Sequence, residues 1–150
     1  MSNRKEFDDR CRALADCHET ESRLIGDLRL LLDQTSTALT RQAVLRILDR
    51  LLDSLPLHLE LASQGGYLTE VHRLRPNWHR QVEALHGANV GCLSELHELR
   101  DHVSSESPSA TIESEESGEI DIWVRSLESI RRHERQLLQG AFTLDIGGEA

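Results

Sequence analysis

The chain has 150 residues, a formal net charge of -9 and only 3% aromatic residues. That length suits a single domain with a sizeable core, and the charge argues against a nucleic-acid binder, because phosphate contacts need clustered Lys and Arg. No hydrophobic signal region opens the sequence and no apolar run approaches membrane length, so we expect a cytoplasmic protein without a membrane partner. Cys11, Cys17 and Cys92 lack CxxC spacing, which favours reduced thiols over a disulfide framework.

A leucine-rich, proline-poor sequence with a 3.6-residue apolar period predicts helices. The first is expected at about Cys11–Asp33, with the residues before Cys11 either extending it or fraying. The second is expected at about Leu39–Ser63, and the short polar linker 34–37 between them favours antiparallel neighbours.

The second half of the chain predicts two more helices, with a different kind of connection between them. A loop through Gly66 and Arg75 should lead to Pro76, whose fixed φ suits the first turn of a third helix at about 77–102. The segment Ser104–Gly118 is rich in Ser and Glu, which predicts a mobile, solvated loop. A fourth helix should follow at about 119–143. We therefore expect an all-α, single-domain protein: an up-down antiparallel four-helix bundle over 1–150, with the loop at about 104–118.

One histidine lies on the inner face of the second predicted helix. The positions that share this face are Val44, Ile47, Leu51, Leu55, His58 and Ala62. A polar ring there needs a hydrogen-bonding partner or a metal ion. The pair Gly65-Gly66 should end this helix by supplying left-handed backbone geometry.

A second group of possible metal ligands is the set His79, Glu83 and His86, which share one helix side at i, i+4 and i+7. This side falls off the predicted core stripe, so a solvated polar face is the simpler interpretation. Cys92, by contrast, falls on or beside the buried stripe and is best interpreted as a small apolar residue.

Four helices, the stretch HLELASQGGYL at 58–68 and the closing stretch LLQGAFTLDIGG at 137–148 together resemble the bacterial hemerythrin-like (HHE cation-binding) proteins. The resemblance covers about residues 21–148. It implies an up-down four-helix bundle that holds two irons among inward-facing His and carboxylate side chains.

Carried over to this sequence, that resemblance implies a largely lost metal site. Leu28, Ala62, Asn89 and Ile130 stand where the family places ligands, whereas His58 and Glu134 keep ligand-type side chains. An alternative register in the fourth helix uses His133 with Leu137 at the carboxylate position. We prefer the register with Ile130 and Glu134, because it keeps both on the inner face without a gap.

Two functional interpretations remain open from the sequence. The favoured one is a non-catalytic binding, sensing or scaffold module without catalytic or cofactor-binding residues, with His58 and Glu134 as remnant metal positions and a protein partner or homo-oligomer of unknown identity. The other is an iron-binding protein of the family type, for oxygen or iron handling, with an atypical ligand set. We expect His58 and Glu134 to meet inside the bundle in either case.

Overall fold

The computed structural model describes residues 2–34, 36–37, 39–63 and 66–147, and the side chains of those between 4 and 141. Its elements are helical: α1 (Ser2–Asp33), α2 (Thr40–Ala62), α3 (Tyr67–Leu74), a 3-10 turn (Pro76–Trp78), α4 (His79–Ser105) and α5 (Ser114–Gly147). The all-α prediction with four long helices is confirmed. None of the helices in the described ranges combines the length and apolarity needed to span a bilayer.

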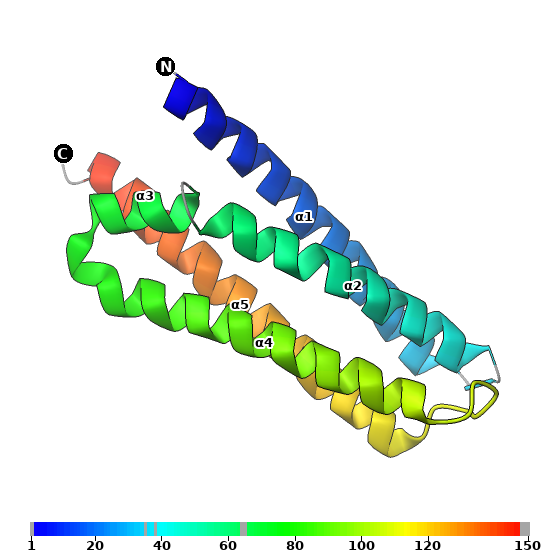
Figure 1. Ribbon diagram of the computed structural model, residues 1–150. Coiled ribbons are helices and arrows are strands. Elements are labelled where there is room, and N and C mark those ends of the chain that lie inside the picture. The colour runs from blue at the N-terminus through cyan, green and yellow to red at the C-terminus, as the bar shows by residue number, and fades with distance from the viewer. Residues whose placement is uncertain (1, 35, 38, 64–65, 148–150) are drawn as a thin grey trace.

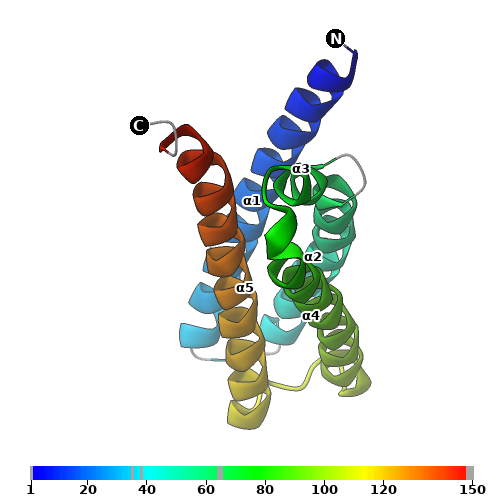
Figure 2. The same ribbon diagram turned by 90° about the vertical axis from the view of Figure 1, so that its left-hand side faces the viewer.

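The four long helices form a bundle in which α1 packs on α2, α2 on α4, and α4 on α5. The start of α1 and the end of α5 lie at one end of the bundle, and the short α3 crosses near the same end (Figure 1). Turning the view shows α1 and α5 splaying apart toward that end (Figure 2). The connections α1–α2 and α4–α5 lie together at the opposite end, where the backbone N–H of Ile112 donates to Ser36 Oγ at 2.7 Å.

The core is built from the apolar stripes that the helical period predicts. Its fully buried members include Leu28, Val44, Leu48, Leu51, Leu96, Ile120 and Leu127. Cys92 belongs to this core, as predicted, and burial raises its pKa to about 11, which keeps the thiol protonated and unreactive. The indole N–H of Trp123 donates to the Cys92 carbonyl at 3.0 Å and joins α5 to α4.

The segment 64–75 differs from the predicted loop, because Tyr67–Leu74 forms α3. Tyr67, Leu68 and Val71 are buried at i, i+1 and i+4. Eight residues are too few for a stable isolated helix, so tertiary burial of this face stabilises it.

The predicted left-handed helix stop is wrong at Gly66, whose backbone is extended with φ -94 and ψ -163. Glycine is needed there for a steric reason: a Cβ would lie 1.9 Å from the Leu61 carbonyl oxygen. Gly65 lies outside the described residues.

The bounds predicted for the loop at Ser104–Gly118 are wrong at both ends. Helix α4 continues to Ser105 and α5 begins at Ser114, so only 106–113 is irregular. This loop is fastened by Arg41 of α2, which donates to the carbonyls of Ala110 at 3.1 Å and Thr111 at 2.9 Å. The fastening residue lies about seventy positions earlier in the chain, so local composition does not reveal it.

Arg41 is also the largest fully buried side chain among the described residues. Its guanidinium donates to both carboxylate oxygens of Glu116, each at 2.6 Å, and to the Val103 carbonyl at 2.9 Å. Glu116 in turn accepts the backbone N–H of Glu113 at 3.1 Å, an orphan donor at the start of α5. One buried ion pair therefore closes the loop end of the bundle.

This ion pair predicts a specific acid dependence of stability. The hydrogen bond from Arg41 holds the pKa of Glu116 below its usual value, although burial opposes the shift. A folded-state pKa below that of the unfolded chain gives stability that is complete above about pH 4.3 and is lost as the pH falls. We expect the unfolding free energy of the wild type to fall more steeply below that pH than that of Glu116→Gln. Urea titrations at a series of pH values measure this, and parallel slopes would contradict it.

Candidate metal centre

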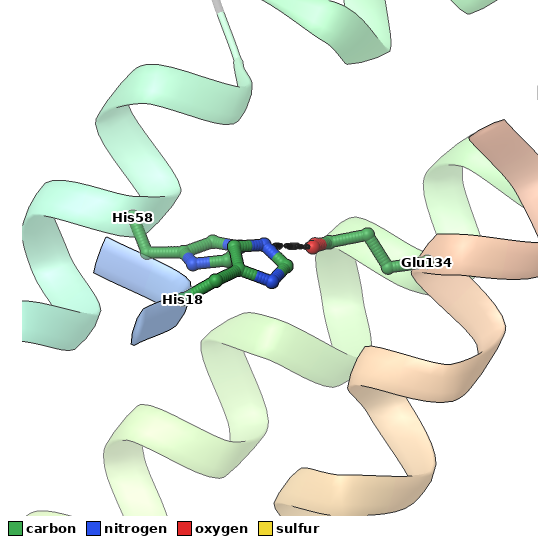
Figure 3. Close-up of side chains that lie close together, drawn as sticks. All are labelled: His18, His58 and Glu134. Atoms are coloured by element: carbon green, nitrogen blue, oxygen red, sulfur yellow. Dashed lines mark hydrogen bonds and ion pairs between the residues drawn. The ribbon is translucent and has the colours of Figure 1, made fainter. Parts of the chain in front are cut away.

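Three side chains with metal-ligating atoms converge inside the bundle: His18 from α1, His58 from α2 and Glu134 from α5. Figure 3 shows the two imidazole rings lying against each other and the carboxylate facing them. The ring centroids are 4.8 Å apart, and one ligand atom from each residue lies within 4.8 Å of the others. Among the residues that the structure describes, this is the only such group of three or more His, Cys, Asp or Glu.

Two of the distances between the donor atoms are close to those expected around one ion. Nε2 of His18 lies 2.9 Å from Glu134 Oε1, and Nε2 of His58 lies 3.2 Å from the same oxygen. Metal bonds of about 2.0–2.1 Å in a tetrahedral site place neighbouring ligand atoms about 3.3 Å apart. These two distances are therefore compatible with a shared ion as well as with hydrogen bonds.

The three side chains differ in their access to solvent. The side chains of His58 and Glu134 are 0% exposed, whereas that of His18 is 37% exposed. The cluster is thus enclosed on the α2 and α5 sides and reachable past His18.

The second oxygen of the Glu134 carboxylate is occupied by a neighbour. Tyr67, at the start of α3, donates its phenolic O–H to Glu134 Oε2. Burial and the adjacent Glu134 charge raise the pKa of Tyr67 above its ordinary value, so the phenol keeps its proton and remains a donor. Oε1 therefore contacts both histidines, whereas Oε2 accepts from Tyr67 and also lies 3.0 Å from His58 Nε2.

A second group of buried polar side chains lies next to His18, His58 and Glu134. Arg131 binds both carboxylate oxygens of Glu21 at 2.8 and 3.0 Å and donates to Asn89 Oδ1 at 2.6 Å. Its guanidinium also lies 3.6 Å from Glu134 Oε2. Two carboxylates, Glu21 and Glu134, face one guanidinium here, so one negative charge is left for a cation to balance: a metal ion or a protonated imidazole.

The electrostatics of Glu134 follow from these contacts. Burial alone would raise its pKa, but the hydrogen bonds from His18 and His58 and the nearby Arg131 charge hold the pKa well below its usual range. Glu134 is therefore an ionised carboxylate at neutral pH, which is the form that binds metals.

No family model matches this chain, and neither a curated protein nor a solved structure does.

The structure tests the register predicted for the inner residues. Leu28, Ala62 and Ile130 are 0%, 2% and 8% exposed, which confirms that they lie on inner faces of the bundle. His58 and Glu134 do meet, at 3.0 Å between Nε2 and Oε2, as predicted. Ile130 and Glu134 are buried and His133 is exposed, so the inner face predicted for the fourth helix is confirmed.

Four residues of the cluster were not found from the sequence: His18, Glu21, Tyr67 and Arg131. The sequence does contain a signal for Glu21. It shares one helix face with Cys17, Leu24 and Leu28, so it is a carboxylate on an otherwise apolar stripe. His18 lies three residues before it, next to Cys17. Leu28, which was aligned with the ligand position of the family, lies nearly three turns further along α1. Asn89 is buried as predicted, but it contacts Arg131 rather than a histidine.

The surface set His79, Glu83 and His86 borders a shallow depression together with His72 of α3. The rings of His72 and His79 are 5.4 Å apart. The ligand atoms of His79, Glu83 and His86 do not converge as those of the core group do. The simpler prediction of a solvated polar face therefore agrees with the described structure.

Proposed function

We propose that this protein is a helical bundle that binds one divalent transition-metal ion through His18, His58 and Glu134. The convergence of two imidazole nitrogens and one ionised carboxylate, from three different helices, is the observation that carries the proposal. Zn²⁺ and Fe²⁺ both accept two histidines and a carboxylate. Three ligands supplied by protein leave a coordination position for water or a small ligand, and the exposed side of His18 is where that position would be reached.

The site that we propose differs from both forms that the resemblance to hemerythrin-like proteins suggested. Those forms were a remnant without bound metal and an iron site with an atypical ligand set. Within the described residues three donors converge, which is enough for one ion and sparse for the two irons of that family. We also propose that the four long helices have up-down topology and that the chain is related to that family. A role in sensing or binding, with no reaction assigned, is the function that the site supports.

Metal content tests this directly. Protein purified without an affinity tag is analysed for bound metals, stripped by a chelator, and titrated with Zn²⁺. We expect one Zn²⁺ per chain for the wild type and loss of that binding in His18→Ala, which removes the most exposed of the three side chains. The matched control is His79→Ala, a surface histidine outside the cluster, which should bind as the wild type does. Equal binding by His18→Ala and the wild type would exclude the site.

The second candidate is the metal-free scaffold module that the sequence favoured. One observation supports it: Arg131 lies 3.6 Å from Glu134 and already supplies part of the positive charge that an ion would bring. In that case a protonated histidine completes the charge balance, and the wild type takes up no stoichiometric Zn²⁺.

A further inference from the structure

One atom in the buried cluster has no hydrogen-bond partner. It is Nδ1 of His58, and among the described residues it is the only buried side-chain nitrogen or oxygen in that condition. Its nearest carboxylate oxygen is Oε1 of Glu21, at 3.6 Å, too far for a hydrogen bond. A buried polar atom without a partner lowers stability. A state of the protein in which Nδ1 forms a hydrogen bond would therefore be favoured.

Glu21 is held firmly in the place where it could supply that partner. The guanidinium of Arg131 binds it bidentately, with two parallel N–H bonds that restrict the carboxylate to one orientation. Arg131 is held in turn by Asn89, whose amide donates to the Leu85 carbonyl at 3.0 Å. The chain of contacts runs from α4 through α5 to α1 and ends facing the histidine on α2.

In the metal-free site Nε2 of His58 must carry a proton, because it lies 3.0 Å from an ionised carboxylate that can only accept. A metal ion on Nε2 requires that nitrogen to be bare, and the neutral ring then carries its proton on Nδ1. The Nδ1–H group would point at Glu21, and a movement of a few tenths of an ångström would complete the hydrogen bond.

We propose that Glu21, pinned by Arg131, is the positioning residue that orients His58 for metal binding by accepting its Nδ1–H. The inference rests on the proposed metal function and adds to it a role for two residues that do not touch the ion. Carboxylate partners of this kind fix the tautomer and ring orientation of a ligating histidine, and losing one typically lowers metal affinity 10–100-fold.

The test is a titration of the metal-free, full-length protein with Co²⁺, followed by visible absorption. We expect Glu21→Gln to weaken Co²⁺ binding roughly 10–100-fold. The matched control is Glu19→Gln, an exposed carboxylate on the same helix that should leave the affinity unchanged. Wild-type affinity in Glu21→Gln would overturn the inference while leaving the metal site intact. Absence of Co²⁺ binding by the wild type would instead overturn the proposed function, and the inference with it.

Two further measurements separate positioning from a purely structural role. Arg131→Lys keeps a positive charge but loses the bidentate hydrogen bonds to Glu21, so it should weaken Co²⁺ binding as well. This variant also keeps the test decisive if Glu21→Gln fails to fold. In the Zn²⁺-loaded protein, the NMR signal of the His58 Nδ1 proton should shift between the wild type and the Glu21 or Arg131 variant that folds. Variants that change only the unfolding free energy, with unchanged affinity and unchanged Nδ1 signal, would show that the pair is structural and would overturn the inference.

Discussion

Replacing Arg41 by alanine should lower the unfolding free energy by about 3–5 kcal/mol, the range measured when one partner of a buried ion pair is removed. The side chain is 1% exposed, and it satisfies the carboxylate of Glu116 and three backbone carbonyls. Its loss leaves a buried negative charge and frees the loop 106–113. Chemical denaturation followed by circular dichroism measures the change.

An exposed pair of similar geometry provides the control. Arg29 of α1 donates to both oxygens of Glu128 on α5, at 2.5 and 2.8 Å, but the two side chains are 44% and 36% exposed. Water screens that pair, so Arg29→Ala should cost no more than about 1 kcal/mol. Equal losses from the two arginine variants would show that burial does not determine the strength of the Arg41 contact.

In the metal-free protein, His58→Ala or Glu134→Ala alone should cost roughly 2–4 kcal/mol, because each removal leaves buried polar partners unsatisfied. For Glu134 those partners are His18, His58 and Tyr67. The double replacement should cost less than the sum of the single ones, because the two residues share one hydrogen bond. A double-mutant cycle measured by urea denaturation in chelator tests this, and strictly additive losses would mean that the contact carries no coupling energy.

The same variants behave differently when metal is present. If the proposed site is loaded, the wild type gains stability with the concentration of free Zn²⁺, because the ion binds the folded state. Neither His58→Ala nor Glu134→Ala should show that gain. If the midpoint of unfolding of the wild type does not change with the concentration of free Zn²⁺, the result would favour the metal-free scaffold.

The helical class and the residues of the interior were predictable from the sequence alone. An apolar period of 3.6 residues indicates which face of a helix is buried, and this does not depend on which helix packs against it. That is why Leu28, Ala62 and Ile130 were correctly placed inside and why His58 and Glu134 were recognised as polar residues on inner stripes. The same logic extends to Glu21 on its apolar stripe, although its role could not be deduced from α1 alone.

Contacts between distant segments were decided only by the tertiary structure. Arg41 meets the 106–113 loop, Tyr67 meets Glu134, and His18 meets His58 across separations of about 40 to 70 residues. Periodicity gives the face on which a residue lies but not the level along the bundle at which helices cross, so it could not show that His18, rather than the position of Leu28, lies opposite His58. Composition likewise predicted a mobile Ser/Glu-rich loop. It could not show that a buried arginine from another helix binds this segment. The apolar pattern is a local property of each helix, whereas the candidate site is made by the register between helices, which depends on packing of the whole chain.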